Sequence, residues 1–274
     1  MFWTRLASGI AMLVVAIAAM FVGSWPLLLI LYLCSMVAFR ELTKVLGCAT
    51  NPKKINALEV IGLLGVTGYY AATFLATDRV MQLMCIVAVF LAEMFWYVVT
   101  FPKYKADHVV SAVFSFMYAP LLLSFVYLTR QGEHGFYLVW LILISSWGCD
   151  TCAYAVGMLI GKKKIFPKLS PKKSLEGCIG GTLGAALIGC LYGFFIVEKV
   201  LPGQNIAWVI AFICAVTAVM SMVGDLAASA IKRNKEIKDY GKLIPGHGGI
   251  MDRFDSMTVT APMIYFLSLL MIGI

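Results

Sequence analysis

Charged residues are scarce in this chain of 274 residues: they make up 13% of it, where a soluble domain carries about 25%. Hydrophobic residues make up 61%. So little charge excludes an ordinary water-soluble domain over most of the length. A spanning helix takes about 20 apolar residues, so the chain has room for about eight to ten membrane helices.

Several features of known catalytic and transport proteins are also missing. The chain has three histidines, and no Ser-His-Asp or Cys-His arrangement for nucleophilic catalysis is visible. No internal repeat is visible, which counts against the inverted repeats of many transporters. Most of the eight cysteines lie in apolar runs, where a thiol packs as a small hydrophobe. Cys149 and Cys152 form a C-x-x-C pair, but without a second cysteine or histidine pair it favours neither zinc nor redox chemistry.

Apolar runs separated by polar breaks predict an all-α polytopic membrane protein with about nine transmembrane helices. The predicted spans are 6–22, 25–39, 57–76, 81–101, 109–128, 136–160, 178–197, 207–230 and 257–274. The first run resembles a signal peptide, but the second follows at once, so we expect a retained helix. We divide the chain into N-terminal membrane spans, 1–135, and a catalytic membrane region, 136–274, with polar loops at 161–177 and 231–256.

Lysines and arginines are distributed unevenly between the two sides of this plan. Three of the 22, Arg79, Arg130 and Lys199, fall on one side, and all the others fall on the side of the N-terminus. The positive-inside rule therefore predicts a cytoplasmic N-terminus and an external C-terminus. Both polar loops then face the cytoplasm, where nucleotides are found. This rule and anionic lipid headgroups account for the net charge of +8, so we expect no nucleic-acid partner.

The longest polar stretch near the C-terminus, 229–255, reads SAIKRNKEIKDYGKLIPGHGGIMDRFD. It combines phosphate-binding cations, metal-binding carboxylates and glycines that let backbone N–H groups approach an anion, which nucleotide chemistry requires. Asp252 and Asp255 lie three residues apart at the start of the last span. Such carboxylates either cap the helix or hold a divalent cation, and both interpretations stay open.

Three acidic residues stand out inside predicted spans: Glu93, Asp150 and Asp225. An Asp at the centre of a span costs about 2.5–3.5 kcal/mol, so each of them needs a reason. Glu93 lies near the end of its helix, where it reaches water, pairs with a neighbouring helix or belongs to the site. Asp225 shares a helix face with Ser229 and Lys232, because they are spaced i, i+4 and i+7.

Asp150 shares a helix face with Tyr154, Gly157 and Gly161. That face carries a carboxylate, a phenol and two positions where another backbone can come close. It leads into a basic loop that continues as S-P-K-K-S-L-E-G at 170–177 and then as a Gly-Gly pair, for which helix packing is the simplest interpretation.

These two regions resemble the phosphatidate cytidylyltransferase (CDP-diacylglycerol synthase) family. The 229–255 stretch fits its signature throughout, as S-x-I-K-R, K-D-x-G and I-P-x-H-G-G-I-x-D-R-F-D. The upstream block is similar to its D-x-x-A-Y-x-x-G and S-P-x-K-[TS]-x-E-G-x-x-G-G patterns. Ser174 stands where threonine is more frequent, and it keeps the hydroxyl. The resemblance covers 147–255, and the first 140 residues match only as hydrophobic spans.

The resemblance implies an enzyme of phospholipid biosynthesis that makes CDP-diacylglycerol and pyrophosphate from CTP and phosphatidic acid. It implies Mg²⁺ held by Asp225, Asp252 and Asp255, a second cation such as K⁺, and a homodimer. The expected catalytic residues are Asp225, Lys232, Arg233, Lys238, Asp239, His247, Asp252, Arg253 and Asp255. The expected substrate-binding residues are Asp150, Tyr154, Ser170, Lys173, Ser174, Ser229, Gly248 and Gly249. Lys162 to Lys164 are expected at the membrane surface, and the short plan favours a bacterial inner membrane.

Three alternatives remain. A CTP-dependent polyprenol or phytol kinase shares the membrane setting and the nucleotide, but the complete signature argues against it. A CDP-alcohol phosphotransferase has a D-G-x-x-A-R motif before a G-x-x-x-D-x-x-x-D tail; here the tail is one residue short and the leading half is lacking. A transporter for an anionic substrate would use the buried carboxylates for coupling, but the polar groups gather on one face and not at the midplane.

Overall fold

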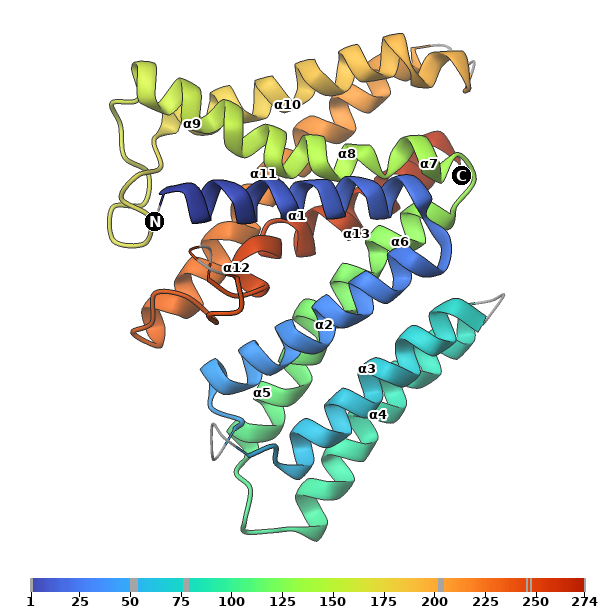
Figure 1. The fold of residues 1–274 in the computed structure, drawn as a ribbon, viewed down its shortest axis with the longest axis vertical. Coiled ribbons are helices and arrows are strands. Elements are labelled where there is room, and N and C mark those ends of the chain that lie inside the picture. Colours follow the sequence, from blue (N-terminus) through green and yellow to red (C-terminus); the bar gives the residue numbers. More distant parts are fainter. Residues whose placement is uncertain are drawn as a thin grey trace. The chain divides into compact units, whose positions relative to one another are not determined.

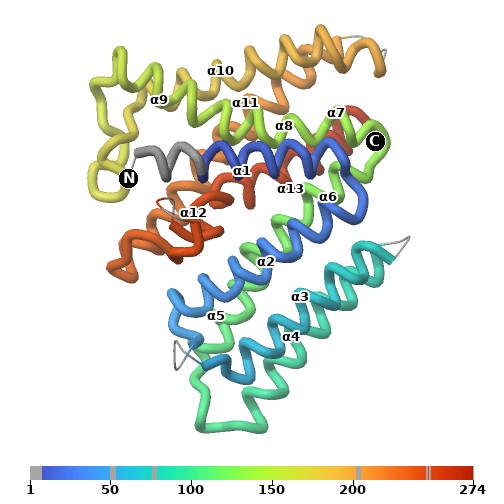
Figure 2. Tube along the Cα trace, in the orientation of Figure 1, coloured from blue at the N-terminus to red at the C-terminus, as the bar shows by residue number. Residues whose placement is uncertain are grey.

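The computed structural model describes residues 2–49, 54–75, 79–201, 205–244, 246 and 248–273, and for residues 2–7 the backbone only. Over these residues the chain is a set of helices with two isolated β-bridges and no strand (Figure 1). The predicted all-α class is confirmed. Two compact units can be followed by colour in Figure 2. Unit 1 comprises Met1–Ser124 and Asp239–Arg253, and unit 2 comprises Phe125–Lys238 and Phe254–Ile274.

Unit 1 holds the N-terminal helices. They are α1 (Phe2–Val22), α2 (Ser24–Leu46), α3 (Ala57–Leu75), α4 (Val80–Val99), α5 (Ala106–Phe116) and the π-helical turn η1 (Met117–Leu121), after which α6 (Leu122–Gln131) begins. Gly23, with φ 66°, separates α1 from α2 at the predicted break. Helices α3 and α4 lie side by side, and both contact α5 (Figure 1).

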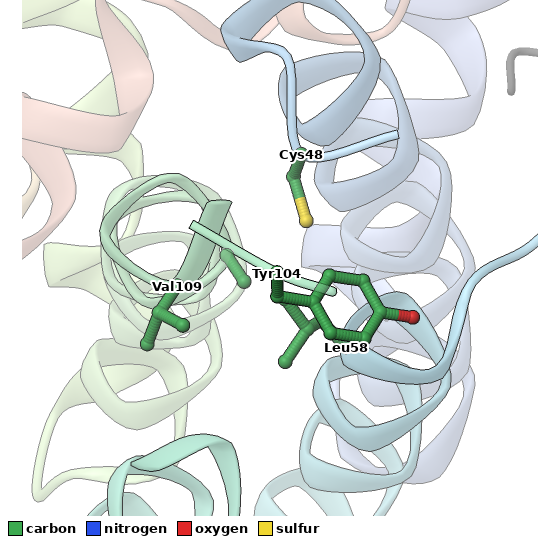
Figure 3. Close-up of a cluster of buried hydrophobic side chains, with 5 residues drawn as sticks. Cys48, Leu58, Tyr104 and Val109 are labelled. Carbon is green, nitrogen blue, oxygen red and sulfur yellow. The ribbon is translucent and has the colours of Figure 1, made fainter. Parts of the chain in front are cut away.

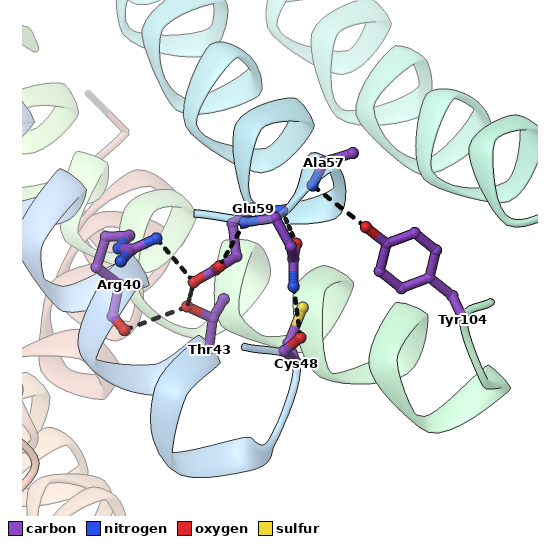
Figure 4. A network of polar contacts seen from close by, with 7 residues as sticks. Arg40, Thr43, Cys48, Ala57, Glu59 and Tyr104 are labelled. Atoms are coloured by element: carbon purple, nitrogen blue, oxygen red, sulfur yellow. Dashed lines mark hydrogen bonds and ion pairs between the residues drawn. The ribbon is translucent and has the colours of Figure 1, made fainter. Parts of the chain in front are cut away.

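The start of α3 is fixed by a polar network (Figure 4). Asn56 and Glu59 form a reciprocal cap: each side chain accepts the backbone N–H of the other, at 2.9 and 3.0 Å. The buried Glu59 carboxylate also accepts from Arg40 at 2.9 Å and from Thr43 at 3.0 Å, both on α2. The Asn56 amide donates to the carbonyl of Cys48 at 2.6 Å. A buried carboxylate is tolerated here because an arginine and several donors satisfy it.

A hydrophobic cluster lies beside this network (Figure 3). It consists of Cys48, Leu58, Tyr104, Val109 and Ala112, all buried. The Tyr104 hydroxyl, at its edge, accepts the backbone N–H of Ala57 at 3.4 Å. The cluster therefore joins the end of α2, the start of α3 and the start of α5.

Unit 2 holds the C-terminal helices. After α6 these are α7 (Gly135–Leu138), α8 (Trp140–Leu143), the π-helical turn η2 (Ile144–Gly148), α9 (Cys149–Ile160), α10 (Leu175–Phe195), η3 (Val197–Lys199), α11 (Ile206–Asn234) and α13 (Met257–Ile272). The short helix α12 (Met251–Phe254) begins in unit 1 and ends in unit 2. Helix α10 packs against α9 and α11, and α11 packs against α13 (Figure 1).

Small residues let α10 approach its neighbours closely. Its buried positions are Gly177, Gly181, Ala185, Gly189 and Gly193, one at every fourth residue. A Cβ added at Gly181 would lie 2.9 Å from the Cβ of Ala153 on α9, and one added at Gly193 would lie 2.8 Å from the Cα of Ala207 on α11. Stripes of this kind hold membrane helices together by close backbone contact. The packing interpretation of the Gly-Gly pair is confirmed for both members, because a Cβ at Gly180 would lie 2.6 Å from the Cβ of Val156 on α9.

Seven helical segments in the described part of the chain are long and apolar enough to cross a membrane. They are Ser24–Leu46, Ala57–Leu75, Val80–Val99, Ala106–Gln131, Gly135–Ile160, Leu175–Lys199 and Ile206–Asn234. Two shorter apolar helices are Ser8–Val22 and Met257–Ile272. Every predicted span overlaps one of these segments. The number that crosses the bilayer and the orientation stay predictions.

Candidate active site

An ion pair joins the two motif-bearing regions within unit 2. Lys173, in the loop before α10, has its Nζ 2.5 Å from Oδ2 of Asp225 on α11. The side chains are 20% and 30% exposed, so the pair is accessible and still partly shielded from water. Sequence analysis selects both residues for the site, and the structure brings them into direct contact.

The loop that carries Lys173 is folded by its own polar groups. Ser174 is the buried N-cap of α10, and its Oγ accepts the N–H of Gly177 at 3.2 Å. The Glu176 carboxylate accepts the backbone N–H groups of Lys162 at 3.0 Å and Lys163 at 3.2 Å. A cap needs only a hydroxyl, which explains why serine suits a position where the family pattern more often has threonine.

The glycines of the Asp150 face make room for this cap. A Cβ at Gly157 would lie 3.2 Å from the Ser174 Oγ, and one at Gly161 would lie 2.5 Å from it. The predicted close approach of another backbone is confirmed at Gly157, where an added Cβ would lie 3.7 Å from the Cα of Gly177, whereas at Gly161 the group that comes close from another segment is the Ser174 hydroxyl. The carbonyl of Ser170, expected to bind substrate, accepts the N–H of Lys173 at 3.2 Å and so shapes the loop.

A pocket of about 500 Å³ lies beside the ion pair in unit 2. Its polar lining comes from Asp150 and Tyr154 on α9 and from Lys164, Lys172 and Lys173 in the loop, and Ser174 and Met222 also line it. The volume is within the range of small-molecule sites. Lys164 lines the pocket, and its Nζ donates to the carbonyl of Lys172 at 3.3 Å. Its expected place at the membrane surface stays a prediction. Three lysines around one wall favour an anionic ligand.

Asp255 lies between α12 and α13 in unit 2 and is buried. Its Oδ1 accepts the N–H of the next residue, Ser256, at 2.8 Å. Ser256 is the N-cap of α13 and has no side-chain cap hydrogen bond among the described residues, so this contact does not establish Asp255 as a helix cap. Burial, and after it the carboxylate of Asp225, raises the pKa of Asp255 to about 7, against the opposing effect of Lys232. Asp225 and Asp255 are thus within electrostatic reach of each other. No three metal-ligating side chains converge on one point in the described part of the chain.

Asp252 belongs to unit 1, where it is buried and organises the signature segment. Its Oδ2 accepts the N–H of Tyr240 at 2.7 Å and the N–H of Gly249 at 3.0 Å. Gly248 has φ 85°, a conformation that favours glycine, and a Cβ there would lie 2.8 Å from the same oxygen. The N–H of Gly249, expected to contact phosphate, is therefore directed at Asp252 in this structure.

Glu41 is a buried residue that contacts the signature segment and that sequence analysis missed. It lies on α2, and its carboxylate accepts the N–H groups of Ile250 at 3.2 Å and Met251 at 2.9 Å. The predicted second span ended at residue 39, so Glu41 fell outside the search for acids in spans. Glu59 lies inside its predicted span and was missed as well. An acid in or beside an apolar helix was the available signal for both.

The remaining predicted residues have diverse surroundings. Ser229, Lys232 and Arg233 lie on α11, which continues to Asn234, so the polar stretch begins as helix and not as loop. Lys238 and Asp239 are exposed, Arg253 is half-buried, and His247 lies outside the described residues.

Glu93 on α4 is fully buried in unit 1. Among the residues that the structure describes, neither of its carboxylate oxygens has a hydrogen-bond partner. Of the three interpretations of Glu93, the one in which it reaches water is therefore wrong, and its membership of the site stays a prediction.

Fold and site define the class of protein: a polytopic helical membrane protein with a basic pocket beside acidic side chains. A model of the cytidylyltransferase family matches residues 3–271, so the chain belongs to that family. The phosphatidate cytidylyltransferase of Bacillus subtilis is 26% identical over 270 residues, 96% of each chain. That of Staphylococcus haemolyticus is 29% identical over 274 residues, 96% of this chain and 97% of the relative. That of Haemophilus influenzae is 38% identical over 152 residues, 56% and 52% of the two chains. The similarity thus extends beyond 147–255 into the N-terminal helices.

Proposed function

We propose that this membrane protein transfers the cytidylyl group of CTP to phosphatidic acid, making CDP-diacylglycerol and releasing pyrophosphate. The family match over nearly the whole chain and the activity named for its relatives support this reaction. The observation in the structure that carries the proposal is the Lys173–Asp225 ion pair beside a lysine-lined pocket in a unit of membrane helices. A site that joins two anionic substrates needs cationic groups to reduce their repulsion. Carboxylates are useful in such a site when they hold a metal ion.

The reaction joins a phosphate oxygen of the lipid to the α-phosphorus of CTP. The bond from that phosphorus to the bridging oxygen of the β-phosphate breaks, and pyrophosphate leaves with the electron pair. The attacking phosphate is already ionised at neutral pH, so no strong general base is required. Lys164, Lys172 and Lys173 reduce the repulsion between the two anions and compensate charge as it moves to the leaving group.

The acidic residues fit a divalent cation. Mg²⁺ is usually held by one or two protein carboxylates together with substrate phosphates, and it keeps several waters. In unit 2 the carboxylates of Asp225 and Asp255 repel each other, and a cation removes that repulsion. We assign the Mg²⁺ to these two residues of unit 2. That Asp252 is a further ligand is implied only by the family resemblance. When bound, it supplies positive charge to the phosphates of CTP.

The family resemblance further supports a second cation, such as K⁺, and phosphate contacts from Lys232, Arg233, Lys238 and Arg253. It also supports a homodimer, which mass measurement in detergent would detect. The acyl chains stay in the bilayer while CTP arrives from water. The uneven distribution of lysine and arginine supports a site on the cytoplasmic side, and the bacterial relatives support an inner membrane.

The test is release of pyrophosphate by the purified protein in detergent with phosphatidic acid, CTP and Mg²⁺, and with ATP in place of CTP as the parallel reaction. We expect release only when CTP and lipid are both present, with CDP-diacylglycerol as the lipid product. Nucleoside diphosphate formed with an alcohol acceptor would identify a polyprenol or phytol kinase instead. A folded protein without turnover on any nucleotide would support the transporter.

A further inference from the structure

The carboxylate of Glu41 connects two distant parts of unit 1. Glu41 lies near the end of α2, and only 7% of it is exposed. Its Oε1 accepts the N–H of Ile250 at 3.2 Å and its Oε2 accepts the N–H of Met251 at 2.9 Å, across 209 and 210 residues of sequence. Both oxygens of one buried carboxylate are thus used to hold two consecutive backbone amides of the signature segment.

Two glycines of that segment pack directly on this carboxylate. A Cβ at Gly249 would lie 2.5 Å from Oε2 of Glu41, and a Cβ at Gly241 would lie 2.8 Å from its Cδ. Real Cβ atoms do not approach so closely, so any side chain at either position would displace the glutamate. The glycines are therefore matched to Glu41 as much as to any ligand.

The contacts of Glu41 continue directly into those of Asp252. Asp252 accepts the N–H of Gly249, and Glu41 accepts the next two N–H groups, those of Ile250 and Met251. Three consecutive amides thus point at two carboxylates, and this fixes the course of the backbone immediately before Asp252. A shift of Glu41 would move the backbone from which the Asp252 side chain projects.

We propose that Glu41 is a positioning residue: it holds the 249–251 backbone so that Asp252 and Arg253 are presented correctly for cytidylyl transfer. The inference rests on the proposed function for its effect on catalysis, whereas the tether itself does not depend on it. Glu41 acts through the backbone and touches neither substrate in this argument. Residues that orient a metal ligand typically change activity or metal affinity about 10- to 100-fold when they are lost.

Replacing Glu41 with glutamine separates a positioning role from a merely structural one. Glu41→Gln keeps the length but replaces one acceptor oxygen with an NH₂ group, which cannot accept an amide N–H. We expect it to lower kcat about 10- to 100-fold and to raise the Mg²⁺ concentration needed for half-maximal rate. Glu133→Gln is the matched control, because its side chain is 77% exposed. A merely structural role would reduce the amount of folded protein and leave kcat per folded molecule and the Mg²⁺ requirement unchanged.

A double-mutant cycle tests the steric match. Gly249→Ala alone should strongly lower kcat per folded molecule, because the new methyl group meets the Glu41 carboxylate. In the Glu41→Ala background the same change should lower kcat much less, because the carboxylate that the methyl group would meet is absent. Equal losses in both backgrounds would refute the direct packing of Gly249 on Glu41.

Hydrogen exchange tests the hydrogen bonds from Ile250 and Met251 to Glu41, the tether, without any assay of activity. Amides of Ile250 and Met251 should exchange at least 10-fold faster in Glu41→Gln than in the wild type, while amides in α3 keep their rates. Unchanged exchange at 250 and 251 would overturn the proposal even if the variant were inactive. If the wild type released no pyrophosphate but the exchange rates changed as expected, the proposed reaction would fail and the tether would stand.

Discussion

Replacing Lys173 with methionine removes the cation that faces Asp225 while keeping most of the apolar stem. In the folded protein its Nζ lies 2.5 Å from the Asp225 carboxylate, with side chains 20% and 30% exposed. Removing one partner of a fully buried pair costs about 3–5 kcal/mol, whereas an exposed pair contributes at most about 1 kcal/mol. Partial exposure puts this pair between these limits, at about 2 kcal/mol. For a chain of this size that corresponds to a fall in Tm of about 4–8 °C.

The same substitution should act on catalysis. Lys173 lines the pocket, and removing one preorganised group that stabilises transition-state charge typically lowers kcat about 10²- to 10³-fold. Pyrophosphate release and a thermal unfolding curve in detergent measure the two effects on one preparation. Lys168→Met is the control, because Lys168 is an exposed lysine of the same loop and does not line the pocket. A Lys173→Met protein that matched this control in Tm and in kcat would refute the reasoning.

Three further substitutions have separable effects. Asp252→Asn should abolish turnover in protein that still inserts and elutes as a folded species. The amide oxygen keeps one acceptor for the backbone N–H groups, but it is a poor ligand for Mg²⁺. Near-normal Mg²⁺-dependent release of pyrophosphate would exclude Asp252 as a ligand. Gly181→Leu should destabilise unit 2 by about 1–3 kcal/mol or more, because α9 and α10 are too close for a side chain, and an unchanged Tm would contradict that packing. Asn56→Ala should lower the free energy of unfolding by about 1 kcal/mol through loss of the α3 cap, and kcat per folded molecule should stay unchanged. A lower kcat would mean that α3 contributes to the site.

The helical plan was accessible from sequence because it depends on local composition. Each predicted span overlaps an apolar helix of the described residues, and Gly23 marked a break that the structure confirms. The ends of the helices were harder to predict. Helix α11 continues to Asn234 through charged residues, because water solvates them equally well on a helix. The π-helical turn Ile144–Gly148 inside the sixth predicted span has no pattern in the local sequence that predicts it.

The site was predictable in part, where it depends on residues of one helix. Asp150, Tyr154 and Gly157 were placed on one face by their spacing, and the structure puts all three at the pocket. Contacts between segments distant in sequence were not predictable in this way. The Lys173–Asp225 pair joins two motifs whose spacing says nothing of their distance, and Glu41 meets amides about 200 residues away. Helical periodicity relates residues within one helix and gives no information on which helices meet.

The Glu41 contact has a consequence for how the protein is made. Helix α2 leaves the ribosome 210 residues before Met251, which at about 5–20 residues per second is an interval of roughly 10–40 seconds. During that interval the α2 carboxylate has none of its final amide partners. The helix must therefore enter the bilayer on the strength of its apolar residues alone, with its acidic end close to water. Unit 1 becomes complete only when almost the whole chain has been synthesised, so a chain stopped before residue 250 lacks the segment that covers Glu41.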